Sequence, residues 1–254
     1  DWEPGTMIDV LDIPQGTSGN KINVYANDPT GNQIPQVEHT YAYIKSGIFG
    51  IINEKQVSIG ETTIGGRREL SNANGYFDIT NLSVLALERG ATAREAIQVM
   101  GELGETYGYK DGGEMLGVAD KDEVWIFEMI GPGPLWSQGD DAPGAFWVAQ
   151  RIPDGYIGAS ANAPMIDVFD PDDTENFLCS PGIKEYAIEQ GWYDPASGEE
   201  FSWREHFMNV NKPETSGRRV WRAFTLAAPS LVGELDEADL PVYVKPDKKL
   251  SIDD

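Results

Sequence analysis

The stretch INEKQVSIGETTIGGRREL, residues 52–70, contains a short alternating run followed by a double glycine and two arginines. Residues 41–63 together predict two strands joined by a turn at 53–55. Glycine lets a backbone approach a ligand closely, and groups at Thr62 and Thr63 could then point at a developing oxyanion. An ordinary strand and turn has the same pattern, so the segment alone assigns no site.

Two helices are expected after this stretch. The first covers residues 82–89 and ends at Gly90, a residue type common just beyond a helix. The second begins at Thr92, with Glu95 at capping-box spacing. Its apolar residues recur three or four positions apart until Gly108, which is typical of a helix with one buried face.

The second half of the chain begins with runs dense in β-branched and aromatic residues, at 123–130, 145–152 and 156–162. The Pro-Asp-Gly turn at 153–155 predicts antiparallel pairing of the last two runs. A helix is expected from Ser180 to Gly191, with Pro181 at its first position, and another over 218–227. This order predicts an α+β fold with helices packed against antiparallel sheet.

Composition limits the classes of protein that fit. The 254 residues are 40% hydrophobic, which suits a single domain over residues 1–254. Acidic residues outnumber basic ones by 42 to 19, so we expect no nucleic-acid or membrane partner. The first residues lack the basic and apolar regions of a signal peptide. The compartment stays open, with the cytoplasm preferred and a secreted or periplasmic location as the alternative.

Few residues are available for metal or thiol chemistry. Cys179 is the only cysteine, and His39 and His206 are the only histidines. Cys179 precedes a predicted helix, which lowers a thiol pKa, but its apolar neighbours are typical of a small buried side chain. The acidic run at 167–176 lacks the glycine and closing glutamate of an EF-hand, so an exposed loop is expected, with adventitious calcium as the alternative. We expect no metal or other cofactor.

Several long blocks resemble one family. Residues 52–70 share this likeness with ALERGATAREAIQVMGELGETYGY (86–109), GEMLGVADKDEVWIFEMIGPGPLW (113–136), FWVAQRIPDGYIGASAN (146–162) and SGRRVWRAFTLAAPS (216–230). They are similar to the bacterial cysteine dipeptidases of PepD type, in the N-terminal-nucleophile hydrolase superfamily. The blocks follow the family's order and span roughly residues 5–251.

The resemblance implies a four-layer αββα sandwich, with two antiparallel sheets between helices, that hydrolyses short peptides. The implied nucleophile is the thiol of an N-terminal cysteine, and its own α-amino group is the base. An α-amine has a pKa near 7.7 to 8.0, which suits a base at neutral pH. No such cysteine opens this sequence, so we expect a sandwich truncated at the N-terminus, and at the C-terminus as well, that is inactive alone. Unpaired strand edges would then favour a homo-oligomer.

Two catalytic residues carry over from the superfamily by position. Thr63 falls where an oxyanion-hole donor is expected, and because relatives have asparagine there, its backbone N–H is the predicted donor. Asn162 matches an asparagine that binds the tetrahedral intermediate. The structural alternative for Asn162 is an amide that caps a strand end.

Three further positions are expected in or beside the site. Arg219 matches a catalytic-site arginine, with Arg218 or Arg222 as alternative counterparts; all three could instead lie on a solvated helix face. Glu61 and Thr62 are expected to bound the substrate pocket.

Two other functions remain open at this stage. One is a catalytically dead paralogue that binds peptides or acts as a scaffold. The other is an amidase acting on N-acyl amino acids, because the superfamily uses the same chemistry on several amides. An in-frame cysteine codon a few dozen codons upstream of Asp1 would favour the dipeptidase.

Overall fold

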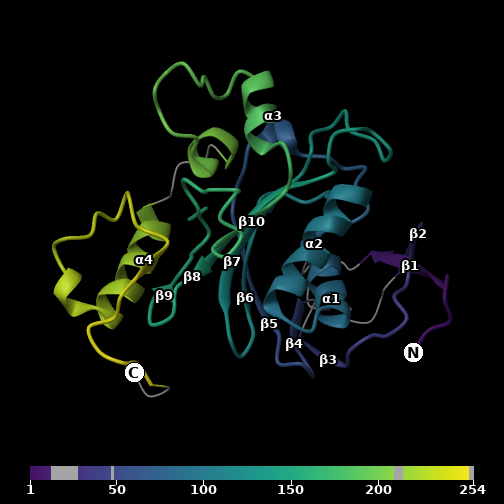
Figure 1. The fold of residues 1–254 in the computed structure, drawn as a ribbon, viewed down its shortest axis with the longest axis horizontal. Helices are drawn as coiled ribbons and strands as arrows, with labels where there is room; N and C mark the ends of the chain where they lie inside the picture. The colour runs from purple at the N-terminus through teal and green to yellow at the C-terminus, as the bar shows by residue number, and fades with distance from the viewer. Residues whose placement is uncertain (13–27, 47–48, 209–213, 252–254) are drawn as a thin grey trace, which may run out of the picture.

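A computed structural model describes residues 1–12, 28–46, 49–208 and 214–251 (Figure 1). Its main element is a seven-stranded antiparallel sheet in the order β10-β8-β7-β6-β5-β4-β3. Its strands, in chain order, are β3 Tyr43–Ser46, β4 Phe49–Asn53, β5 Ser58–Thr63, β6 Glu114–Ala119, β7 Val124–Ile130, β8 Phe146–Ile152 and β10 Phe177–Cys179. The predicted α+β class is therefore confirmed.

Helices α1 (Ile79–Arg89) and α2 (Ala93–Tyr107) cover one face of this sheet (Figure 1). Thr92 caps α2 as predicted, because its hydroxyl accepts from the Glu95 N–H at 3.2 Å. The first helix begins three residues earlier than predicted, since Asp78 accepts from the Asn81 N–H and acts as the N-cap. Apolar side chains of β5 to β8 pack beneath both helices and form the first hydrophobic core.

The buried side chain of Asn53 joins this helix layer to the turn between β4 and β5. Its amide nitrogen donates to the carbonyls of Leu87 and Gly90 at the end of α1, at 2.9 and 2.8 Å. Its oxygen accepts from the N–H groups of Lys55 and Val57 within the turn. The predicted turn therefore also fixes where α1 ends.

The opposite face of the sheet carries the remaining helices, a short strand pair and a second hydrophobic core. These elements are β9 Ile157–Gly158, β11 Tyr243–Val244, α3 Ile183–Glu189, the π-helix η2 Trp203–Met208 and α4 Glu214–Ala227. The β9–β11 pair rests on the sheet, since a Cβ on Gly158 would meet the side chain of Ile152 at 2.8 Å. Figure 1 shows β9 and α4 on the side of the sheet away from α1 and α2.

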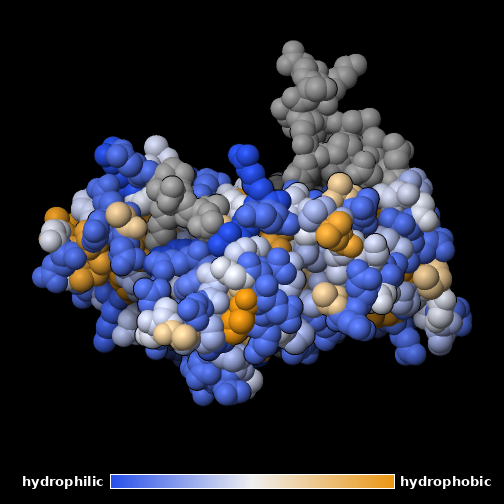
Figure 2. Space-filling model, turned by 90° about the horizontal axis from the view of Figure 1, so that it is seen from above, coloured by the Kyte–Doolittle hydropathy of each residue, from blue (hydrophilic) through white to orange (hydrophobic). Residues whose placement is uncertain are grey.

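The remaining elements lie at the periphery. Strands β1 (Met7–Asp12) and β2 (Asp28–Pro35) form a separate antiparallel pair next to α1, and Asn81 donates to the Leu11 carbonyl at 2.8 Å. The 3₁₀ turns η1 and η3 span Arg68–Leu70 and Pro229–Leu231. None of the helices in the described ranges has the length and apolar character needed to span a bilayer. Hydrophilic side chains cover most of the face seen in Figure 2, and hydrophobic ones form small separate groups.

The predicted pairing of residues 145–152 with 156–162 is wrong. Strand β8 pairs with β7 and β10, whereas β9 pairs with β11. The predicted turn does form, with Tyr156 N–H donating to the Pro153 carbonyl at 3.0 Å, but it sends the chain onto the face of the sheet. The strand also ends at Gly158 instead of Asn162.

The other differences concern element ends and one missed strand. Helix α3 begins at Ile183 because Ser180 hydrogen-bonds to Trp147 beside the sheet and Gly182 is left-handed. Helix α4 begins at Glu214, four residues before the predicted start. Strand β6 was not predicted from its residues, because the short run EMLGVA contains a glycine and few β-branched side chains.

One buried carboxyl group links the second core to the sheet. Glu128, in the middle of β7, is completely buried. Its side chain accepts from the N–H groups of Met165 and Ile166 at 2.5 and 3.1 Å, and from the Trp203 indole at 2.9 Å. Burial raises the pKa of Glu128 to about 7, although these hydrogen bonds act in the opposite direction.

We predict that Glu128 makes stability fall with rising pH. A raised folded-state pKa means that the folded chain holds the proton more tightly than the unfolded chain. The contribution is therefore fully present below the unfolded pKa near 4.5 and is lost as the pH rises through about 7. We expect the free energy of unfolding, measured with urea, to decrease between pH 4.5 and pH 8. The decrease should be about 3 kcal/mol larger in wild type than in Glu128→Gln. Parallel pH profiles of the two proteins would contradict this.

Candidate active site

The end of β5 presents its two threonines in different directions. Ile64 N–H donates to the Gly113 carbonyl at 3.0 Å, on the β6 side. Because successive residues of a strand direct their polar groups to opposite edges, the N–H and carbonyl of Thr63 face away from β6. On that side, ladder pairing of β5 with β4 is recorded among the described residues only at Ile52 and Ser58. The predicted donor, Thr63 N–H, therefore lies on the edge of β5 that faces away from β6.

Asn162 lies against these threonines in a strained backbone conformation. Its φ is +57°, in the left-handed region that asparagine tolerates better than most residues. Its N–H donates to Thr62 Oγ1 at 3.1 Å, and its side-chain Nδ2 donates to the Thr63 carbonyl at 2.6 Å. Its carbonyl accepts from Ser216 Oγ at 3.4 Å. These contacts hold the left-handed conformation in place.

Arg219 on α4 completes the group. Its Nη2 donates to Asn162 Oδ1 at 3.1 Å and to the Ala161 carbonyl at 2.9 Å. A guanidinium can only donate, so this contact requires the amide oxygen of Asn162 to face α4 and its NH₂ group to face β5. The alternative counterpart Arg218 instead pairs with Glu214 and Glu237.

Of the two residues predicted to bound the substrate pocket, only Thr62 directs its side chain toward Asn162. Glu61 and Thr62 both border a cavity on that face, but strand alternation sends their side chains to opposite faces. Thr63 Oγ1 donates to Glu61 Oε1 at 2.9 Å on the helix-covered face. Glu114, the ladder partner of Thr63, is buried there, and burial together with Glu61 raises its pKa well above the usual range.

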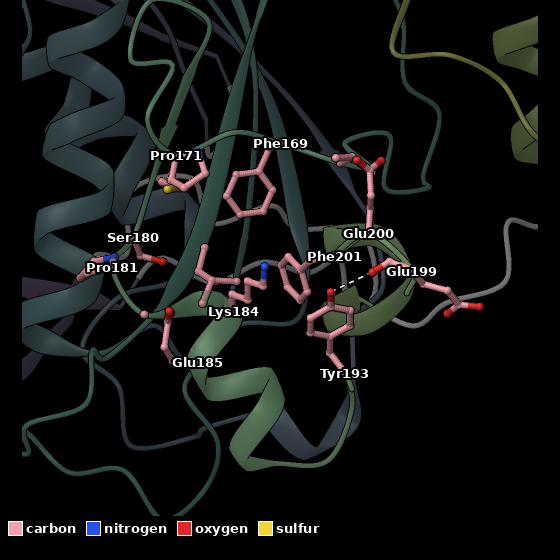
Figure 3. A pocket seen from close by; sticks show the side chains of 14 residues that line it. Phe169, Pro171, Ser180, Pro181, Lys184, Glu185, Tyr193, Glu199, Glu200 and Phe201 are labelled. Atoms are coloured by element: carbon pink, nitrogen blue, oxygen red, sulfur yellow. Dashed lines mark hydrogen bonds between the residues drawn. The ribbon is translucent and has the colours of Figure 1, made fainter. Parts of the chain in front are cut away.

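Cys179 lies in a different place. It borders a cavity of about 550 Å³ between α3 and the loops at 168–171 and 193–201, and the side chains of Phe169, Phe201 and Tyr193 surround this space (Figure 3). The described hydrogen-bond partners of Asn162, which are Thr62, Thr63, Ser216 and Arg219, do not border it. Burial raises the pKa of the Cys179 thiol to about 11, the reverse of what a thiolate nucleophile needs.

The histidines and the acidic run lie apart from Asn162 in their hydrogen bonds and ion pairs. His39 is exposed and contacts Asp1, whereas the His206 ring stacks on Phe201 and hydrogen-bonds to Ser202. Asp167, at the start of the acidic run, pairs with Arg204. Across the described part of the chain, no group of histidine, cysteine, aspartate and glutamate side chains is arranged to hold a metal ion.

Sequence reasoning missed two residues that support Asn162. Ser216 contacts its carbonyl, and Glu128 holds the N–H groups of Met165 and Ile166 a few residues downstream. The available signal was a glutamate within the apolar run VWIFEMI, since a charge inside a buried strand requires partners.

Comparison with known proteins identifies the family of this chain. A family model described as Peptidase family C69 matches residues 27–254. This chain belongs to peptidase family C69. The resemblance drawn from the sequence blocks is thereby confirmed at the level of the family.

Curated relatives of this C69 chain are named as dipeptidases. A probable dipeptidase of Latilactobacillus sakei is 27% identical over 92% of this chain and 50% of its own length. One from Salmonella dublin is 30% identical over 77% of this chain and 44% of its own length. Dipeptidase A of Lactobacillus helveticus is 28% identical over 83% and 44%. The chain thus spans about half the length of the curated relatives that it matches.

Replacing Arg219 in the C69 chain should disturb Asn162 specifically. In Arg219→Ala, Asn162 Oδ1 loses its donor, so we expect the side-chain NH₂ signals of Asn162 to move in a ¹H–¹⁵N NMR spectrum. The free energy of unfolding should fall by no more than about 1.5 kcal/mol. Arg222→Ala, on the same helix, is the matched control and should leave these signals in place. Equal effects of the two substitutions would refute the assigned contact.

The thiol of Cys179 should react slowly. With a pKa of about 11, its thiolate fraction at pH 8 is roughly two orders of magnitude below that of an unperturbed cysteine. Alkylation by iodoacetamide, followed by mass spectrometry, should be slower in the folded chain by about that factor than in urea. Equal rates would show that the folded environment does not suppress the thiolate.

Proposed function

We propose that this chain supplies the carbonyl-binding part of a dipeptidase that acts by acyl transfer. The observation that carries the proposal is the contact between Asn162 Nδ2 and the Thr63 carbonyl, with Arg219 fixing the orientation of the amide. The names of the C69 relatives support peptides as the substrate class.

Two donors would stabilise the developing oxyanion. The NH₂ group of Asn162 carries two hydrogens, and the Thr63 carbonyl takes one of them. The second hydrogen, with Thr63 N–H at the same strand edge, would bind the oxygen of a scissile carbonyl. A preorganised donor of this kind is worth about 2.7 to 4 kcal/mol of transition-state stabilisation.

The nucleophile in this proposal is an N-terminal cysteine thiol from outside these 254 residues. The α-amine of that cysteine would take the thiol proton, and the thiolate would attack the carbonyl carbon. As the intermediate collapses, the C–N bond breaks and the leaving amine takes the proton held by the α-ammonium group. Water, deprotonated by the same α-amine, would then attack the thioester, release the carboxylic acid and regenerate the thiol. Cys179 does not suit this role because of its raised pKa, so the chain alone is proposed to be inactive.

The αββα sandwich is part of the same proposal, as one domain. The helix layer of α1 and α2, the seven-stranded sheet, the β9–β11 pair on its other face and α4 on that side are compatible with four layers. In this view β9 and β11 belong to a second sheet that further strands would extend. Association of two copies through an open strand edge also remains a prediction.

The test is made on the longest reading frame that contains this chain. Asn162→Gly keeps the left-handed backbone available but removes the amide, so it should lower kcat for dipeptides about 10² to 10³-fold. Gln56→Gly, at the other described non-glycine residue with a positive φ, is the matched control and should retain wild-type rates. Hydrolysis is followed by release of free amino acids.

The outcomes separate the candidate functions. Cleavage of dipeptides that depends on Asn162 supports the proposal. Cleavage of N-acyl amino acids but not dipeptides would assign an amidase instead. Peptide binding without hydrolysis would assign a binding or scaffold protein. Undiminished activity in Asn162→Gly would contradict the role given to this residue.

A further inference from the structure

A cavity of about 250 Å³ lies beside Asn162, on the face of the sheet that carries the second core. We name it the glycine cavity. It is bounded by residues 60–62 of β5, Met115 and Gly117 of β6, residues 124–126 of β7 and Ile152 of β8, and residues 158–160 lie across it. Of these, only Glu61 and Thr62 were expected to bound the substrate pocket.

Two glycines that face each other form its floor. Gly60 of β5 and Gly117 of β6 are ladder partners. A Cβ on Gly60 would meet nothing within 4 Å, and one on Gly117 only the Gly60 carbonyl at 4.0 Å. Neither residue has a positive φ. Glycine inside a strand costs stability. Neither a close packing contact nor a positive φ requires glycine at these two positions. The pair does leave an open space.

The cavity favours an uncharged occupant. Its walls from Met115, Ile126 and Ile152 are apolar. The two hydroxyls at its rim already have partners in the chain: Thr62 Oγ1 accepts from Asn162 N–H, and Ser160 Oγ donates to the Ala163 carbonyl. Its volume equals that of roughly eight water molecules, below the usual range for a whole ligand, so it suits one side chain.

Thr62 connects this cavity to the carbonyl-binding group. The same residue borders the cavity and holds the backbone of Asn162, and the next residue provides the Thr63 N–H. A peptide whose carbonyl meets Thr63 and Asn162 therefore has its adjacent side chain within reach of the cavity. We propose that the glycine cavity binds an apolar side chain of the residue that contributes the scissile carbonyl. This inference rests on the proposed function and adds the substrate preference.

The experiment uses the chain labelled at isoleucine δ1 methyl groups and at amide nitrogen, titrated with leucylglycine and glycylglycine. Leucylglycine should shift the methyl signals of Ile126 and Ile152 and bind at least about tenfold more tightly than glycylglycine. Ile183, which borders the larger cavity, should not respond. The side-chain amide of Asn162 reports carbonyl binding independently.

Gly117→Val fills the cavity, and valine suits a strand. This variant should lose the preference for leucylglycine, about tenfold, while glycylglycine binding stays as in wild type. Gly60→Ala narrows the same space from the other strand and provides a second variant. Gly112→Val is the matched control, because a Cβ there also meets nothing within 4 Å but lies outside the cavity.

The possible results distinguish failure of the cavity proposal from failure of the carbonyl-binding role. Equal affinities of the two peptides, with the Asn162 amide shifted and the Ile126 and Ile152 methyls unmoved, would overturn the cavity proposal and leave carbonyl binding intact. If neither peptide moves the Asn162 amide or the methyl signals, the carbonyl-binding role and the cavity both fail. A preference that persists in Gly117→Val would also overturn the cavity.

Discussion

The arrangement of the second face of the sheet depends on the buried carboxyl of Glu128. An apolar side chain at this position would leave the N–H groups of Met165 and Ile166 and the Trp203 indole without their acceptor in a buried region, which costs more than a hydrogen bond gains. Apolar surfaces can pack in several registers, whereas three directed donors fix one. The interior strand β7 thereby sets where residues 161–166 lie, and with them Asn162.

Strand β5 contributes to both faces of the sheet because its side chains alternate between them. Glu61 and Thr63 point to the helix-covered face, where Glu114 is buried, while Thr62 points to Asn162 and the glycine cavity. The N–H and carbonyl groups of Thr63 point to neither face of the sheet. They lie at the edge of β5, where the carbonyl accepts from Asn162 Nδ2. Three neighbouring residues therefore present a carboxylate, a hydroxyl and a peptide group in three separate directions, with no irregularity in the strand.

The sequence predicted what depends on local pattern and family resemblance. The cap of α2 follows from the capping-box spacing of Thr92 and Glu95, and the strands β7 and β8 follow from runs of β-branched and aromatic residues. The resemblance named the residues Thr63, Asn162 and Arg219 that the fold brings together. The opposite directions of Glu61 and Thr62 were also within reach, since a period of two is the basic property of a strand.

What the sequence could not provide is pairing between distant segments. Strand β9 pairs with β11, more than eighty residues away, although a nearer strand and a suitable turn suggested another partner. The facing of Gly60 and Gly117 likewise needs the register between β5 and β6, which two glycines fifty-seven positions apart do not reveal.

The group around Asn162 draws on three segments that are far apart in the chain: Thr62 lies 100 residues before it and Arg219 57 residues after it. Closing such long loops is entropically unfavourable until the surrounding core has formed. This group should therefore be among the last features to assemble during folding, and no proteolytic piece that lacks one of the three segments can retain it.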